Sequence, residues 1–448
     1  MAIAPDSTTP EAATMRAVTL RIVPFLMVCY FVAFVDRVNS GFAALQMNQD
    51  VGLSSAAFGL GGGLFFIAYV IFEVPSNLAM EKVGARLWLA RIMISWGLVS
   101  ACMAFVVGPW SFYLVRVLLG AAEAGFFPGV ILYLTYWFPA EYRGRIVALF
   151  MVAIPVSSLL GSPISAALLN TDGWLGLRGW QWLFILEAAP AVLLGIATLV
   201  VLSDGPASAK WLPPAGREWL SARLAAEHAS RPPRVHAALW RVLFDKNVLL
   251  LALIYAAPSA ISNALSLWQP QIIKSFGLTN TQTGLVNGVP FGLASIVMLV
   301  WAARSDRSGE RVWNTALPLA LAAVSLVATI YLTSLSATVA LLSLALIGTY
   351  AIKGPFWALS SEFLGPAAAA AGLAQINALG NLGAFGGSYL LGVIKDETGS
   401  FPLALLPLVA LATIATVAVL YVGRSQTKAA ALAARARPIA AGPGDARF

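Results

Sequence analysis

The chain has 448 residues, of which 59% are hydrophobic and 11% are charged, and its mean hydropathy is +0.81. Soluble globular proteins carry about 25% charged residues, so the composition excludes that class and predicts a chain that lies mostly in lipid. The formal net charge is +8, with an isoelectric point near 9.6. Because the basic residues gather on one side of the predicted membrane, this charge is not interpreted as nucleic-acid binding.

Apolar stretches of roughly 20 residues can cross a bilayer, and the chain holds twelve. They are predicted at residues 19–45, 55–80, 87–107, 109–138, 142–170, 180–203, 247–274, 280–304, 311–333, 337–363, 369–393 and 400–424. The polar segment 204–246 divides them into two groups of six, and a short amphipathic helix is predicted within it at 217–227. Residues 1–18 form an N-terminal segment, and residues 425–448 are predicted to be a disordered tail.

The predicted architecture is therefore an all-α membrane protein with two six-helix halves, residues 19–203 and 247–424. A weak sequence similarity relates the two halves. The loop from Glu81 to Arg86 and the loop from Arg304 to Arg311 are short charged turns at the same place in each half. Duplicated halves around a site at the bilayer midplane are the usual build of secondary transporters.

The placement of lysine and arginine predicts the orientation in the membrane. Of the 28 basic residues, 22 flank the side that holds both termini and the central loop, and three lie on the other side, namely Arg178, Lys274 and Lys395. Cytoplasmic loops carry the excess of basic residues, so both termini are predicted to be cytoplasmic. High arginine and alanine contents favour a bacterial inner membrane.

Several charged residues lie inside predicted spans, among them Asp36, Arg37, Arg116, Glu123 and Lys353. A charge at bilayer depth costs between about 2.5 and more than about 10 kcal/mol, and such residues usually face a bundle interior or a watery cavity. Arg116 and Glu123 are seven residues apart, which returns to nearly the same helix face about 10 Å along the axis. Both are predicted to face one cavity, as in a carrier of anions.

The predicted spans offer nothing that an enzyme would need. They contain no histidine, so any intramembrane proton carrier must be a carboxylate, and they show no metal cluster or nucleophile with its base. The glycine run Gly380, Gly383, Gly386 and Gly387 lacks the ending of a phosphate loop and is predicted to allow close helix approach. The chain is predicted to need no cofactor and no metal, and to draw its energy from an ion gradient.

Short motifs carry a family resemblance. They are Asp36-Arg37-Val38-Asn39, Phe72-Glu73-Val74-Pro75-Ser76-Asn77, the run from Arg116 to Gly125, Ser305-Asp306-Arg307, the run from Gly354 to Leu359, and Gly380-Asn381-Leu382-Gly383. On these residues the chain resembles the major facilitator superfamily and, within it, the anion:cation symporter family near the tartrate and sugar-acid permeases. The resemblance implies proton-coupled import of a small organic anion by alternating access.

The resemblance also implies roles for individual residues. Arg37 would take a substrate carboxylate, which its planar fork suits. Asp36 and Glu123 would be protonation sites. Arg116 would aid Arg37 in binding the substrate and would link substrate binding to protonation. The alternative for each is a structural ion pair between helices. Phe34 stands where some sugar-acid symporters have a tyrosine, which argues against copying a hexonate specificity.

Lys353 fits the family pattern less directly. It is predicted either to receive a second carboxylate opposite Arg37, or to pair with Glu362 or another acid, or to lie near a helix break made by Gly354-Pro355. Uncharged side chains at family-like cavity positions are predicted to orient the substrate and bind its hydroxyls, with simple packing as the alternative. They are Tyr69, Trp357, Asn377 and Asn381.

Three further residues, Glu73, Asp306 and Arg307, are predicted to gate the cytoplasmic side. The predicted partners are a small organic anion, protons and the lipid bilayer, and the protein is expected to function as a monomer. Two alternatives stay open within the carrier class. One is an organic-anion exchanger or facilitator without proton coupling, and the other is a carrier of a different carboxylate or a vitamin-like substrate.

Overall fold

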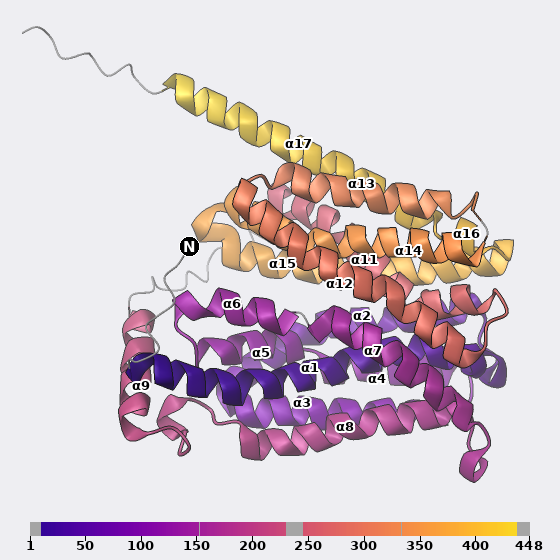
Figure 1. Cartoon of the computed structure of the whole chain (residues 1–448), viewed down its shortest axis with the longest axis horizontal. Helices are drawn as coiled ribbons and strands as arrows, with labels where there is room; N and C mark the ends of the chain where they lie inside the picture. Colours follow the sequence, from indigo (N-terminus) through magenta and orange to yellow (C-terminus); the bar gives the residue numbers. More distant parts are fainter. Residues whose placement is uncertain (1–9, 152, 230–244, 333, 437–448) are drawn as a thin grey trace, which may run out of the picture.

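The computed structural model describes residues 10–151, 153–229, 245–332 and 334–436, and the regular elements in these ranges are all helical. The first half contains α1 (Pro10–Val51), α2 (Ser55–Val83), α3 (Ala85–Cys102), α4 (Pro109–Glu123), α5 (Phe126–Thr135), α6 (Ala140–Met151), α7 (Ala153–Leu168) and α8 (Gly179–Val201). After α9 (Pro214–Ala229), the second half contains α11 (Lys246–Lys274), α12 (Asn280–Ser308), α13 (Val312–Ala328), α14 (Leu335–Ala351), α15 (Lys353–Thr398), α16 (Phe401–Ala404) and α17 (Leu406–Ala436) (Figure 1).

Polar caps begin several of the long helices. Ser54 accepts the N–H of Ala57 at the start of α2, and Asp245 accepts two N–H groups at the start of α11. Thr279 and Gln282 form a capping box at the start of α12. Each of these three helices has 29 residues, which corresponds to about 43 Å and exceeds the hydrocarbon thickness of a bilayer.

Within the described part of the chain, nine helical segments are long and apolar enough to cross a membrane. The shorter apolar helix α13 occupies a tenth predicted span. The α6–α7 pair and the second part of α15 occupy the predicted stretches 142–170 and 369–393. The prediction of an all-α membrane protein with twelve spans is confirmed.

The helix α15 contains parts of two spans because the chain folds back within it. The ring of Tyr255 lies 5.3 Å from the ring of Phe356, and a Cβ atom on Gly380 would collide with that same tyrosine ring. A straight helix would separate residues 356 and 380 by about 36 Å. Both positions can meet Tyr255 only if the chain reverses between them.

The helices α1–α8 lie together in one layer and α11–α17 in the other (Figure 1). We call the end of the bundle that carries α9 the α9 end, and the opposite end the α16 end. At the α16 end the N–H groups of Ser55 and Ala56 donate to the carboxylate of Asp396 at 2.9 and 2.7 Å. The Nδ2 atom of Asn170 donates to Oγ1 of Thr281 at 3.0 Å. These bonds join the two halves at this end.

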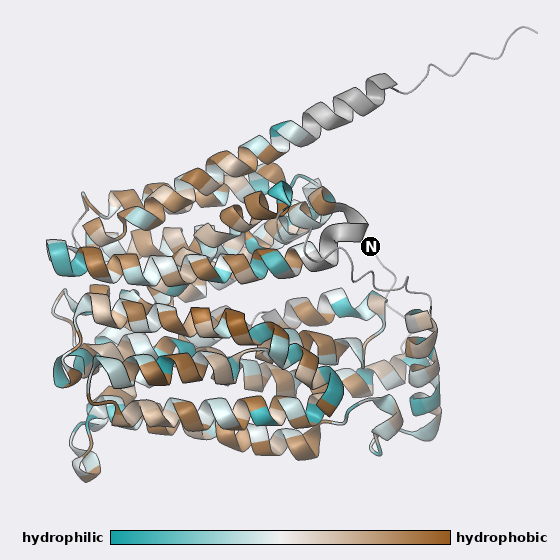
Figure 2. Cartoon of the chain, turned by 180° about the vertical axis from the view of Figure 1, so that it is seen from behind, coloured by the Kyte–Doolittle hydropathy of each residue, from teal (hydrophilic) through white to brown (hydrophobic). Residues whose placement is uncertain are grey.

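The helix α9 covers the stretch for which the sequence predicts a short amphipathic helix. It is largely hydrophilic, whereas the long helices are mostly apolar along their middle parts (Figure 2). Glu227 of α9 lies 2.7 Å from Arg143, and Arg223 lies 3.3 Å from Glu141. These ion pairs hold α9 against the first half.

Both ends of the bundle differ from the predicted boundaries. α1 begins at Pro10 rather than at residue 19, with a proline in its first turn and Glu11 beside it, a combination that favours a helix start. α17 continues to Ala436, so the predicted disordered tail is helical from residue 425 to 436. The reason is the run of alanines, the strongest helix formers, in this stretch. Residues 437–448 lie outside the described residues.

Candidate functional site

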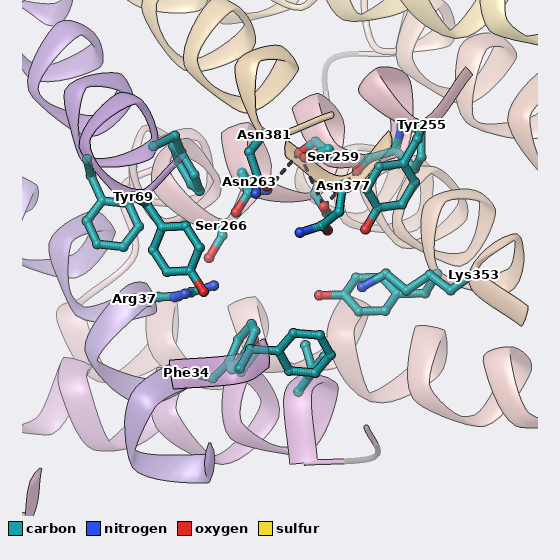
Figure 3. A pocket seen from close by; sticks show the side chains of 18 of the residues that line it. Phe34, Arg37, Tyr69, Tyr255, Ser259, Asn263, Ser266, Lys353, Asn377 and Asn381 are labelled. Atoms are coloured by element: carbon teal, nitrogen blue, oxygen red, sulfur yellow. Dashed lines mark hydrogen bonds between the residues drawn. The ribbon is translucent and has the colours of Figure 1, made fainter. Parts of the chain in front are cut away.

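A polar cavity of about 140 Å³ lies between the two halves. The first half contributes side chains of α1, α2, α5 and α7, and the second half contributes side chains of α11, α14 and α15. Polar members of the lining include Arg37, Tyr69, Asn263, Lys353, Asn377 and Asn381. Figure 3 shows Arg37 and Lys353 pointing into this cavity from opposite sides.

Arg37 is paired with Glu123 of α4. Its Nε and Nη2 atoms lie 2.8 and 2.5 Å from the same oxygen, Oε1 of Glu123. The side chain of Arg37 is 25% exposed and that of Glu123 only 2%, so the arginine forms part of the cavity wall and the acid lies behind it. The guanidinium also lies over the rings of Phe34, Phe65 and Tyr69, with Cζ 4.9 to 5.6 Å from their centroids.

Arg116 is buried on α4, about two helix turns from Glu123, and forms no ion pair with it. Its Nε donates to the carbonyl oxygen of Gly61 at 3.2 Å, and its Nη1 donates to Oγ of Ser40 at 3.3 Å. Together with Asp36, Arg37 and Glu123 it lines a second, smaller cavity next to the first. The predicted shared cavity of Arg116 and Glu123 therefore exists, but Arg37 supplies the partner of Glu123.

Asp36 points away from Arg37 and toward α3. Its carboxylate accepts hydrogen bonds from Nε1 of Trp96 at 2.9 Å, Oγ of Ser100 at 2.5 Å and Nδ2 of Asn39 at 2.9 Å. Side chains of adjacent helix residues point about 100° apart around the helix axis, so Asp36 and Arg37 contact different neighbours. Asp36 also lines the smaller cavity.

Lys353 is the basic residue that the second half contributes to the cavity. Its Nζ atom lies 4.0 Å from the centroid of the Tyr350 ring, and no carboxylate of the described chain lies within ion-pair distance of it. The predicted alternative partner, Glu362, lies 3.5 Å from Nε of Arg311 instead. The pair with Glu362 is thus not formed.

The predicted uncharged residues Tyr69, Trp357, Asn377 and Asn381 all line the cavity. The three predicted gating residues lie outside it. Asp306 pairs with Arg311 at 2.8 Å, and Glu73 is partly exposed on α2. Arg307 is exposed in the last turn of α12.

Several cavity residues were not singled out from the sequence, chiefly Tyr255, Ser259, Asn263 and Tyr350. Tyr255 stacks on Phe356 and lies 4.8 Å from Trp357. Asn263 was the most detectable, since an amide in the middle of an apolar run needs a polar partner. In the described ranges no group of three His, Cys, Asp or Glu residues could hold a metal ion.

Comparisons with known proteins agree with this fold. Residues 26–388 match the family model of the Major Facilitator Superfamily, and the chain belongs to that superfamily. It is thus a transporter and not an enzyme.

Three similar proteins illustrate the range of the family. The chain is 50% identical over 407 residues to a protein of Agrobacterium vitis named "Putative tartrate transporter", covering 91% of this chain and 90% of that protein. It is 41% identical to a quinolone resistance transporter of Acinetobacter baumannii, over 84% and 87% of the two chains. A bacterial homologue of the human lysosomal transporter Spinster, solved in an inward-facing, unoccupied conformation, has the same fold, with a TM-score of 0.75, 16% identity, and coverage of 93% and 98%.

Proposed function

We propose that the protein is a proton-coupled symporter that imports a small organic anion, a tartrate-like or sugar-acid carboxylate, by alternating access. The observation that carries the proposal is the ion pair of Arg37 and Glu123 in the wall of the central cavity. The similarity to a relative named for tartrate supports the substrate class.

The pair can couple a proton to an anion because both compete for Arg37. While Glu123 is ionised, it occupies the Nε and Nη2 donors that a substrate carboxylate would use. Protonation removes the negative charge of Glu123 and leaves Arg37 free for the anion. The bound anion in turn occupies these donors of Arg37. An ionised Glu123 would then lack its counter-ion, so the bound anion favours the protonated form of Glu123. Each ligand then favours the other, as linkage requires.

Asp36 is the second proposed proton carrier, and Arg116 the proposed link between the two acids. Both line the smaller cavity beside Glu123. The guanidinium of Arg116 donates hydrogen bonds to neutral acceptors, the carbonyl oxygen of Gly61 and the hydroxyl oxygen of Ser40. Its field therefore reaches whichever neighbouring acid is ionised.

Transport is proposed to proceed by rocking of the halves 19–203 and 247–424 about the cavity. The α9 end is assigned to the cytoplasm, as the excess of basic residues there indicates. The bonds of Asp396 to α2 then close the outer side in the conformation described here. Glu73, Asp306 and Arg307 are proposed to act in closing the cytoplasmic side. The protein is placed in a bacterial inner membrane and functions as a monomer.

Uptake of labelled tartrate and galactarate into proteoliposomes, with and without an inward proton gradient, tests the proposal. We expect accumulation driven by the gradient in the wild type and its loss in Glu123→Gln, which keeps the shape of the side chain but cannot ionise. Flux that ignores the gradient but accelerates with internal anion would instead assign the protein as an exchanger. Intact gradient-driven accumulation in Glu123→Gln would refute the role of that acid.

A further inference from the structure

The geometry points to a second anion subsite at Lys353, so that the cavity is built for a hydroxylated dicarboxylate held at both ends. One carboxylate would lie at Arg37 and the other at Lys353, with the hydroxyl groups between them facing amide side chains of the second half. The inference rests on the proposed function for the site at Arg37 and on protonation of Glu123, but not on uptake driven by a proton gradient.

Among the described residues, Lys353 has no counter-charge. In the part of the chain that the structure describes, its ammonium group meets no carboxylate, and its one recorded contact is the face of the Tyr350 ring at 4.0 Å. Glu362, the nearest acid in sequence, is engaged by Arg311. A lysine kept for a structural ion pair would lie beside its acidic partner.

The ring of Tyr350 does not replace that partner. A cation–π contact contributes about 0.5–2 kcal/mol, while a charge at bilayer depth costs more, and the ring accepts none of the three N–H donors in the ordinary way. Lys353 is only partly buried, and its remaining surface faces the cavity. Its donors are therefore available to an acceptor that enters from solution.

The two cations face each other across the cavity. Arg37 projects from α1 of the first half and Lys353 from the start of α15 in the second half (Figure 3). Once Glu123 is protonated, neither cation of the cavity wall has an ion-pair partner among the described residues. A dianion neutralises both, whereas a monoanion leaves one of them unpaired. A single molecule that bridges them would also tie the two halves together, which rocking of the halves requires of a substrate.

Amide groups lie between the cations. Asn263 of α11 and Asn377 and Asn381 of α15 are grouped on one side of the cavity (Figure 3). Asn263 uses one N–H on the carbonyl of Ser259 at 2.8 Å and keeps its carbonyl oxygen. Asn377 and Asn381 are one helix turn apart, which places them on one face. An amide both donates and accepts, as recognition of hydroxyl groups requires.

Equilibrium binding to the purified full-length protein tests the subsite with two probes, tartrate and threonate. Threonate keeps the four-carbon hydroxylated chain but has a hydroxymethyl group in place of one carboxylate. We expect Lys353→Gln to weaken tartrate binding by at least about tenfold, the scale of a lost charge-assisted hydrogen bond, and to change threonate binding less than about twofold. Lys353→Arg should restore most of the tartrate affinity. Lys274→Gln, at a lysine that donates to Asn280 outside the cavity, should alter neither.

The outcomes separate the inference from the proposed function. Equal losses for both acids in Lys353→Gln, or no loss for tartrate, would overturn the subsite, as would a wild-type protein that binds neither acid. Tartrate binding that depends on Lys353 in a protein without gradient-driven uptake would support the subsite and refute the coupling. If Arg37→Ala loses binding of both tartrate and threonate while Lys353→Gln weakens only tartrate binding, the results would support both anion positions.

Discussion

Arg37 directs two donors of its guanidinium to one oxygen of Glu123, with Nε at 2.8 Å and Nη2 at 2.5 Å from Oε1. The two residues belong to α1 and α4, so the pair also ties two helices of the first half together. Because the fork closes on a single oxygen, a second carboxylate cannot use the same donors until the pair opens. On the side of the first half, the positive charge of Arg37 in the cavity wall is thus balanced by the negative charge of Glu123.

The fork of Arg37 gives a first prediction. Arg37→Lys keeps the positive charge but loses the planar pair of donors. We expect the affinity for tartrate to fall by about tenfold or more, since hydrogen bonds to charged groups contribute about 1.5–3 kcal/mol each. Isothermal titration calorimetry measures this. Arg91→Lys, at an exposed arginine over the ring of Trp88, is the control, and equal losses in the two variants would contradict a specific role for the fork.

Much of this arrangement can be predicted from sequence. Apolar length predicts the spans, and the cost of burying a charge marks Arg37, Glu123 and Lys353 as cavity residues. The helical period places Arg116 and Glu123 on one cavity, which the structure bears out. These inferences concern single helices, for which the period and the solvent are sufficient.

Partners on different helices could not be predicted in this way. The pairing of Glu123 with Arg37 rather than Arg116, and the donation of Trp96 to Asp36, depend on how α1, α3 and α4 cross. A single sequence contains no signal for crossing geometry. For the same reason the sequence does not identify Tyr255 as a cavity residue. A tyrosine in a span has the same sequence pattern whether it contacts lipid, another helix or a cavity.

The surroundings of Asp36 give a second prediction. Its Oδ2 accepts the indole N–H of Trp96, a group that can only donate. Asp36→Asn places an amide among these donors, so one of them must lose its acceptor. We expect a lower melting temperature in detergent, from a penalty of about 1–3 kcal/mol. The effect of Asp36→Asn should shrink in a Trp96→Phe background, since residues in one network are not additive.

Transport separates the two roles of Asp36. Trp96→Phe removes the donor but keeps the carboxylate, so it should retain gradient-driven uptake, while Asp36→Asn should lose it. If both variants lose stability and both retain uptake, Asp36 is a structural residue and Glu123 remains the only proposed proton carrier.

The bond between Asp396 and the start of α2 gives a third prediction, on pH. Asp396 lies beyond the predicted span 369–393. Although burial alone would raise the pKa of its carboxyl, the hydrogen bonds from Ala56 and Ser55 outweigh it and lower the pKa. A lowered pKa means that the contribution of the bond to closure is fully present above the ordinary aspartate pKa and is lost only as the pH falls through the lowered value. Closure of the α16 end through Asp396 should therefore be constant between about pH 5 and 8.

Spin labels measure that closure. Cysteines at Val107 and Tyr331, both highly exposed, would report the separation of the halves at the α16 end once Cys29 and Cys102 are replaced by serine. Asp396→Asn should increase the population with long distances by about tenfold or more, equally at pH 5 and pH 8. Glu397→Gln, at the exposed neighbouring acid, should leave the distances unchanged. A steep change between pH 5 and 8 that vanishes in Asp396→Asn would contradict the argument.

Close approach of backbones at the α16 end gives the last prediction. A Cβ atom on Gly392 of α15 would collide with the carbonyl oxygen of Ser55 of α2, whereas a Cβ atom on Gly386 would meet nothing within 4 Å. The sequence-based prediction that the whole glycine run serves close approach is wrong at Gly386. We expect Gly392→Ala to lengthen the distance between labels at Val107 and Tyr331 and to shift the protein out of this closed conformation. Gly386→Ala should leave the distance unchanged, because an alanine there fills open space and favours the helix. Equal shifts in both variants would show that helix propensity, not contact between the halves, controls this end.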